Sequence, residues 1–241
     1  MAGAAMVFFM PRHGRRGELR PGTRGALMGF AAGVMTAASF WSLLIPAIGL
    51  SVALGVWAFV PATAGFCLGV ALILGLDRLS PYLFRGAQVP GRRGETMLMA
   101  AVTLHNLPEG MAVGVACAGL MLANGGTTPA GVLSLSLGIA IQNVPEGAII
   151  ALPLWTEGMW KAFSLGTLSG AVEPAGAVLM ILMTRWLSPA MPWLLGFAAG
   201  AMFCVVVEEL IPEMRKSAPG AGTLWFTAGF ALMMALDVAL G

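Results

Sequence analysis

Leu104-His105-Asn106-Leu107-Pro108-Glu109-Gly110 is the stretch that decides the fold, and Ile141-Gln142-Asn143-Val144-Pro145-Glu146-Gly147 repeats its pattern. Both copies place Asn, Pro, Glu and Gly in the same order, with His105 or Gln142 just ahead of the Asn. Both lie in the middle of apolar runs that are long enough to cross a membrane. Polar and ionisable residues at that depth are costly and usually mark the path of a substrate or an ion. The repeat therefore predicts two facing helices, broken at their prolines, that hold a divalent metal ion.

The composition of the 241-residue chain indicates an integral membrane protein. Hydrophobic residues make up 58% of it and charged residues only 10%, whereas a soluble domain carries about 25% charged residues. We therefore expect one transmembrane domain over residues 1–241, with the lipid bilayer as its surroundings. The net charge of +2 gives no indication of nucleic-acid binding. Cys67, Cys117 and Cys204 lie singly in apolar runs, which indicates packing rather than a disulfide or a thiolate metal site.

Apolar runs of about 20 residues, the length that crosses the hydrocarbon core of a bilayer, predict an all-α bundle. Residues 1–10 are apolar but too short to span, and we interpret them as the tail of a helix whose beginning is absent. Residues 11–24 form an arginine-rich linker. Small residues, as in 29–33 and 196–200, predict close helix packing. The predicted full spans number seven: about 25–48, 58–77, 97–122, 131–154, 161–184, 191–211 and 221–240.

The distribution of basic residues predicts the orientation of these spans. Of the 13 Lys and Arg residues, 12 lie in the arginine-rich linker and in the loops on the same side of the predicted membrane. The opposite side has one, Arg185. Lys and Arg concentrate in cytoplasmic loops. We therefore expect the arginine-rich linker in the cytoplasm and the C-terminus on the extracytoplasmic side.

Three acids, Glu109, Glu146 and Glu173, lie in the middle of predicted spans, and no Lys or Arg lies mid-span beside them. An unpaired ionised carboxylate at that depth is expensive. These groups must therefore be protonated, or they must share a cation that the sequence itself does not supply.

The spacing of the polar residues favours the cation. Residues three and four apart share one face of a helix, so His105, Asn106 and Glu109 lie together on one span. Gln142, Asn143 and Glu146 repeat that face on the next. Pro108 and Pro145 each leave a backbone carbonyl without its donor, and transporters commonly build ion sites from such interrupted helices. Carboxylates, one imidazole and amide oxygens suit a borderline divalent ion such as Zn²⁺ or Fe²⁺.

Each of these features alone has a structural explanation. An intramembrane His can hydrogen-bond two helices, a mid-span Pro is often a tolerated kink, and a single Glu can be protonated. Their joint repetition, with a third glutamate at the same depth, favours the metal site. For Glu208 and Glu209, at the cytoplasmic end of the sixth full span, an acidic helix end explains the sequence as well as a path for departing metal does. We interpret Asp237 as structural.

At these residues the chain resembles the ZIP (Zrt/Irt-like) family of divalent metal transporters, in particular its bacterial branch. The stretch 105–110 is similar to that family's fourth-helix signature and 142–147 to its fifth. Glu173, within Ser169-Gly170-Ala171-Val172-Glu173-Pro174, matches the sixth-helix ligand, and 207–213 resembles the acidic end of the seventh helix. The resemblance covers the chain from about residue 25.

The resemblance implies an eight-helix fold, whose first helix is truncated here to the stub at 1–10, and a bacterial inner (plasma) membrane location. It also implies a binuclear centre. One metal would take His105, Glu109, Gln142 and Glu146, and the other Asn106, Glu109, Asn143, Glu146 and Glu173, so that Glu109 and Glu146 bridge. Glu208 and Glu209 would receive the ion on its way out. The amides at 142 and 143, where some members have Asp or His, imply fewer anionic ligands.

The expected function is transport of divalent metal ions, Zn²⁺ foremost and also Fe²⁺, Mn²⁺ or Cd²⁺, into the cytoplasm. The metal is the substrate, and we expect no catalytic cofactor. The alternative is a proton- or sodium-coupled carrier of another substrate that uses the same carboxylates. An intramembrane metalloenzyme would require a HExxH-like histidine pair, and His105 is the one histidine in a predicted span, so we expect no enzyme. The sequence leaves open whether the chain forms a homodimer.

Overall fold

The computed structural model describes residues 3–8, 20–83, 93–121, 128–151, 154 and 158–240, and these residues form helices and short connections with no strand. Residues 9–19, which include most of the predicted arginine-rich linker 11–24, and the loop 84–92 lie outside the described residues, whereas residues 21–24 of the linker already belong to α1. The elements are η1 (Ala4–Phe8), α1 (Pro21–Ala38), the π-helix η2 (Ser39–Leu44), α2 (Ile45–Gly49), η3 (Val52–Trp57), α3 (Phe59–Leu83), α4 (Arg93–Met121), α5 (Pro129–Ala151), α6 (Met159–Gly170), α7 (Val172–Leu187), η6 (Ser188–Ala190), α8 (Met191–Val205), the π-helix η7 (Val206–Leu210), α9 (Ile211–Ser217) and α10 (Ala221–Leu240).

Five stretches within the described residues are long and apolar enough to cross a membrane: Pro21–Gly49, Phe59–Leu79, Met159–Met183, Met191–Ser217 and Ala221–Leu240. This confirms a polytopic all-α membrane protein. The predicted spans at 97–122 and 131–154 fall on α4 and α5, which are 29 and 23 residues long. That α4 and α5 also cross the membrane, which would make seven full spans, stays a prediction.

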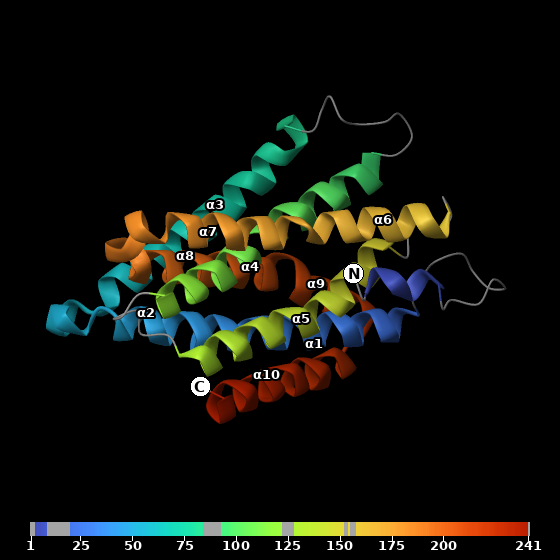
Figure 1. Ribbon diagram of the computed structural model, residues 1–241. Helices are drawn as coiled ribbons and strands as arrows, with labels where there is room; N and C mark the ends of the chain where they lie inside the picture. The colour runs from blue at the N-terminus through green and yellow to red at the C-terminus, as the bar shows by residue number, and fades with distance from the viewer. Residues whose placement is uncertain are drawn as a thin grey trace.

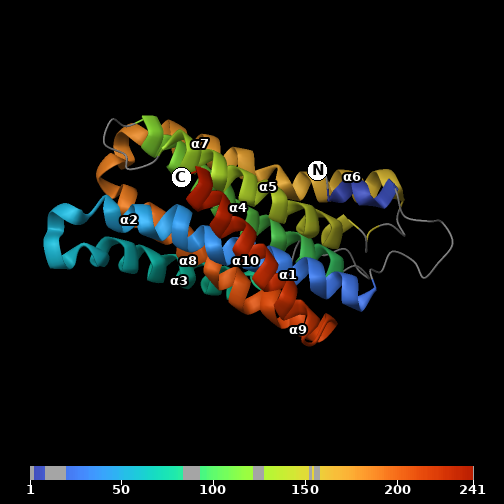
Figure 2. The ribbon, with the colours of Figure 1, turned by 90° about the horizontal axis from the view of Figure 1, so that it is seen from below.

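The long helices run side by side and alternate in direction (Figure 1, Figure 2). One end of the bundle lies on the right of Figure 1. It holds the starts of α1, α4, α6 and α10 and the ends of α3, α5 and α9. α2, η3, η6 and the end of α10 lie at the other end. Arg24, Lys161, Arg215 and Lys216 all belong to elements at the first end, which we call the basic end; the opposite one is the outer end.

Glycines allow three helix pairs, α1 with α10, α3 with α8 and α4 with α7, to approach closely. A Cβ on Gly33 would collide with the backbone carbonyl of Phe226, and one on Gly200 with that of Phe66. Both glycines belong to the stretches predicted to be packing surfaces, and that prediction is confirmed. Small residues do this because backbone contact replaces the side chains that would otherwise separate two helices.

Neither α4 nor α5 is broken at its internal proline: both helices continue through Pro108 and Pro145. The prediction of interrupted helices is wrong at these two positions. The interruptions lie elsewhere, at the turn between α6 and α7 and at the two π-helices. In each π-helix the closing N–H, that of Ile45 or Ile211, donates to the carbonyl five residues back, and a proline follows directly. The wider turn accommodates a proline that cannot donate to the preceding turn.

Residues Ala4–Phe8 fold as a short 3-10 helix that packs against α5 and α6. Ala4 and Val7 are buried there, and the ring of Phe8 lies with its centre 5.0 Å from that of Trp160 and 5.3 Å from that of Phe163. Gly147 of the second motif lies against the backbone of this segment. The segment thus covers the side of α5 that carries the second motif.

Candidate metal site

The two motifs place their polar residues on neighbouring helices, α4 and α5. Glu109 is 1% exposed, Gln142 0% and Asn106 4%. The side chain of Gln142 lies beside the carboxylate of Glu109, close to but not within hydrogen-bond geometry. The side chain of His105 lies outside the described part of the structure, although its backbone precedes Asn106 within α4.

Glu173 joins these helices from the first turn of α7. Asn143 Nδ2 donates a hydrogen bond of 2.6 Å to Glu173 Oε2. Pro174 falls in that same first turn, where the missing N–H costs nothing. A Cβ on Gly110 would collide with the backbone of Glu173, so the glycine that follows Glu109 in the motif is what allows α7 to come so close. The prediction that this glycine admits another backbone is confirmed.

The carboxylates of Glu109, Glu146 and Glu173 lie within electrostatic reach of one another and repel. The charged groups that act on Glu109 and Glu146 among the described residues are other carboxylates. Within the described side chains, no three of His, Cys, Asp and Glu converge closely enough to hold a metal ion. The site is therefore a cluster of three carboxyl groups interleaved with amide groups, which a cation would allow to ionise together.

The amides present oxygen to this charge cluster. Asn106 Nδ2 donates to the backbone carbonyl of Ser169 at 3.1 Å, and Asn143 Nδ2 is bonded to Glu173. With their nitrogens engaged, both asparagines leave their Oδ1 atoms buried and without a hydrogen-bond partner among the described residues. Glu109 Oε2 and Gln142 Oε1 are in the same condition, and so is one donor, Gln142 Nε2, which lies beside Glu109. Four buried acceptors outnumber the single unpartnered donor, and this excess of oxygen beside Glu146 and Glu173 is complementary to a cation.

Two cavities flank the hydrogen bond between Asn143 and Glu173. One, of about 300 Å³, extends toward the basic end and is lined by Glu146, Ser169 and Gly170 among others. The second, of about 280 Å³, extends toward the outer end. Because a water molecule occupies about 30 Å³ of liquid, either cavity has room for a partly hydrated ion beside the site.

The two candidate residues of the departure path, Glu208 and Glu209, differ in their placement. Both lie in η7; Glu208 is exposed, whereas Glu209 is half-buried. Glu209 acts electrostatically on Glu146, so the structure relates it to the paired motifs. Ser169 was not predicted. A signal for it exists in Ser169-Gly170, since a glycine often marks the end of a helix, where the last carbonyls have no donor within the helix.

The comparisons with known proteins agree with one another. The sequence profile described as "ZIP Zinc transporter" matches residues 88–237. The zinc transporter ZIP11 of Homo sapiens is 32% identical over 327 aligned positions, which cover 100% of this chain and 93% of the relative. The zinc transporter ZIPB of Bordetella bronchiseptica is 40% identical, covering 91% of this chain and 72% of the relative. The zinc transporter GufA of Myxococcus xanthus is 34% identical, covering 93% and 90%. The chain belongs to the ZIP zinc transporter family.

Proposed function

We propose that this protein moves divalent metal ions, Zn²⁺ foremost, across a membrane through the cluster of carboxylates and amides between α4, α5 and α7. The observation that carries the proposal is the set of four buried oxygens without a hydrogen-bond partner among the described residues, on Asn106, Glu109, Gln142 and Asn143, close to two further glutamates, Glu146 and Glu173. A divalent cation would satisfy these oxygens and remove the repulsion together. The zinc transporters named above support Zn²⁺ as the first ion to test.

The proposed ligands divide into two adjoining sites. One ion would be held by His105, Glu109, Gln142 and Glu146. The other would be held by Asn106, Glu109, Asn143, Glu146 and Glu173. Glu109 and Glu146 would thus bridge the two ions. The proximity of Glu109, Glu146 and Glu173 supports this division. Because Gln142 and Asn143 are neutral, the sites bind more weakly than all-anionic ones and accept Fe²⁺, Mn²⁺ and Cd²⁺ more readily.

The proposed direction is from the outer end to the basic end. Lys and Arg concentrate on the cytoplasmic side of membrane proteins, so the basic end faces the cytoplasm and the C-terminus, at the opposite end of α10, lies outside. An inner (plasma) membrane is the location we propose. An arriving ion exchanges its waters for the paired glutamates and the amide oxygens. Glu209, which interacts with Glu146, then draws it toward the cytoplasm.

The experiment is zinc uptake into proteoliposomes by the wild type, Glu109→Ala and Glu146→Ala. We expect each variant to lose zinc uptake by more than about a hundredfold, because the loss of a bridging carboxylate disables both sites. Chromatographic behaviour and membrane insertion should match those of the wild type. Uptake at the wild-type rate by both variants would refute the proposal.

The same vesicles separate this function from a proton- or sodium-coupled carrier. Zinc flux driven by the zinc gradient alone, in buffer without Na⁺ and with equal pH on both sides, supports the metal transporter. Flux that requires a proton or sodium gradient supports the coupled carrier.

A further inference from the structure

Thr167, near the end of α6, carries a hydroxyl that the proposed metal ligands do not include. Its Oγ1 atom is buried and has no hydrogen-bond partner among the described residues. The buried serines and threonines that the structure describes all donate to a carbonyl or a carboxylate: Thr36, Ser39, Ser42, Ser51, Ser134 and Ser169. A helical hydroxyl commonly bonds to a carbonyl of the preceding turn. The unbonded oxygen of Thr167 therefore requires an explanation.

Thr167 lines the cavity of about 300 Å³ that extends from the paired motifs toward the basic end. Asn106, Asn143 and Glu146 line the same cavity. The side-chain oxygens of both asparagines are also buried and lack a partner within the described part of the chain. The hydroxyl of Thr167 thus adds an oxygen from a further helix, α6, to the unpartnered oxygens around this cavity.

The packing of α6 against α5 brings Thr167 beside the second motif. A Cβ on the preceding residue, Gly166, would lie 3.1 Å from the Cβ of Ala151 and 3.6 Å from the carbonyl oxygen of Gly147. The two helices therefore meet at the glycine that follows Glu146 in the motif. Close packing of this kind limits how far Thr167 can move relative to Glu146.

We propose that the hydroxyl oxygen of Thr167 is a further ligand for the transported ion, which it meets between Glu146 and the basic end. The inference rests on the proposed function. α6 starts at the basic end and runs toward Glu173, so Thr167 lies on the side of the central ligands from which the ion departs. A hydroxyl can accept through its oxygen while its proton donates, so Thr167 can bind the ion and donate to a carboxylate together. Because oxygen ligands suit Mn²⁺ and thiolates favour Zn²⁺, this residue helps to set the preference among ions.

Thr167→Val separates a ligand from a structural hydroxyl, because valine keeps the branched shape and removes the oxygen. An unpartnered buried hydroxyl costs free energy, so the metal-free variant should unfold at the wild-type temperature or above it. The zinc concentration for half-maximal uptake should rise about tenfold, since even residues that only orient a metal ligand have effects of that size. Thr167→Ser keeps a hydroxyl and should stay near the wild-type concentration.

A structural role predicts the reverse result for Thr167→Val: a lower unfolding temperature with an unchanged half-maximal zinc concentration. That result would overturn the proposal. Ser164→Ala is the matched control on the same helix. The residue is exposed, and its hydroxyl donates to the carbonyl of Trp160 at 2.8 Å, so its removal should leave half-maximal uptake unchanged.

A thiolate at position 167 tests contact with the ion directly. With Cys67, Cys117 and Cys204 replaced, Thr167→Cys puts sulfur in place of the hydroxyl oxygen. Cobalt bound to a thiolate absorbs in the near ultraviolet by sulfur-to-metal charge transfer, so Co²⁺ added to the purified variant should produce this absorption. Ser164→Cys in the same background should not produce it. The preference of uptake for Zn²⁺ over Mn²⁺ should rise about tenfold in Thr167→Cys, because a thiolate favours zinc.

The cobalt absorption also separates failure of this inference from failure of the proposed function. Its absence from Thr167→Cys, when the wild type transports zinc and Glu109→Ala does not, overturns the assignment of Thr167 alone. The hydroxyl would then bind only water in the cavity. Wild-type zinc uptake by Glu109→Ala and Glu146→Ala would instead refute the proposed function itself.

Discussion

Asn143 is the side chain whose hydrogen bond most directly shapes the candidate site. Its amide holds the Glu173 carboxylate at 2.6 Å. Replacing it by Asp would set two carboxylates against each other, so we expect Asn143→Asp to lower the stability of the metal-free protein by about 1–3 kcal/mol. Zinc should offset the loss, because a divalent ion bridges two carboxylates. The thermal shift on adding zinc should therefore be larger than that of the wild type.

Asn143→Ser supplies the control for this prediction. It removes the bond to Glu173 without adding charge, so the stability of the metal-free protein should fall while the zinc-induced shift does not grow. Equal zinc shifts in Asn143→Asp and the wild type would contradict the assignment of Asn143 and Glu173 to a common metal site.

The contact between α4 and α7 depends on the glycine of the first motif. A Cβ on Gly110 would collide with the backbone of Glu173, so Gly110→Ala must push the two helices apart. We expect a loss of about 1–3 kcal/mol in the free energy of unfolding, as for other overpacked contacts, together with slower zinc uptake because Glu173 is displaced. Thermal unfolding in detergent and vesicle uptake measure the two effects.

Gly75 in α3 provides the matched substitution. A Cβ there would meet nothing within 4 Å, and Ala is the better helix former by about 0.5–1 kcal/mol. Gly75→Ala should therefore keep or slightly raise stability and leave uptake unchanged. Equal losses in both glycine variants would mean that backbone flexibility, rather than the α4–α7 contact, explains Gly110.

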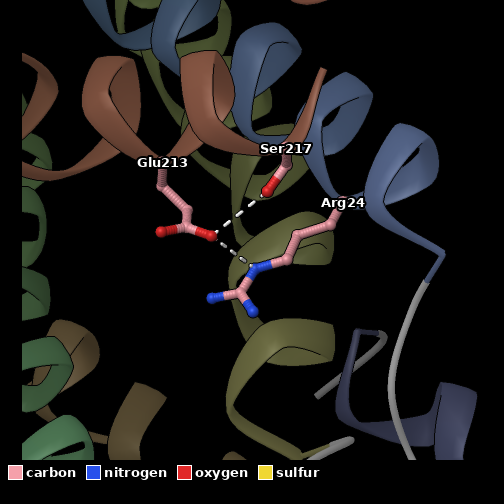
Figure 3. Close-up of polar contacts among 3 residues, drawn as sticks. All are labelled: Arg24, Glu213 and Ser217. Atoms are coloured by element: carbon pink, nitrogen blue, oxygen red, sulfur yellow. Dashed lines mark hydrogen bonds and ion pairs between the residues drawn. The ribbon is translucent and has the colours of Figure 1, made fainter. Parts of the chain in front are cut away.

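The ion pair between Arg24 and Glu213, at the basic end, contributes little to holding α1 against α9. Arg24 Nε at the start of α1 lies 3.0 Å from Glu213 Oε1 on α9, and Ser217 donates to the same oxygen at 3.2 Å (Figure 3). The side chains are 43% and 28% exposed, so the pair is screened by solvent. We expect Arg24→Ala to cost less than about 1 kcal/mol of stability. A much larger loss in thermal unfolding would show that this pair, not the glycine contacts of α1 with α10, holds α1 in place.

The architecture is more predictable from the sequence than the details that shape the site. Apolar length and small-residue spacing identify where helices run and pack, because both depend on local composition. The positions of helix irregularities were not predictable in the same way. Pro108 and Pro145 are accommodated within continuous helices, whereas Pro46 and Pro212 follow π-helices. Whether a proline interrupts a helix depends on what packs around it. The hydroxyls of Ser42 and Ser134 both donate to Asp237, which lies 195 and 103 positions further along the chain, and no local pattern reveals such contacts.

The asymmetry between the two ends of the bundle leads to a prediction about the orientation of the whole chain. The ends of α1, α6 and α9 that lie at the basic end carry Lys and Arg residues, while the outer end presents exposed apolar residues such as Val56, which is 84% exposed. The positive-inside rule then directs the basic end to the cytoplasm. In a cysteine-free background, Val56→Cys should react with a membrane-impermeant maleimide added to intact cells. Ala221→Cys, at the exposed start of α10, should react only after the membrane is opened.

The labelling result bears on transport because it fixes which end meets the incoming ion. If Val56→Cys is labelled from outside, Asp237 lies on the side from which metal arrives and Glu209 on the side to which it departs. Labelling of Ala221→Cys in intact cells would invert the bundle, and with it the proposed direction of transport, while leaving the ligands of the central site unchanged.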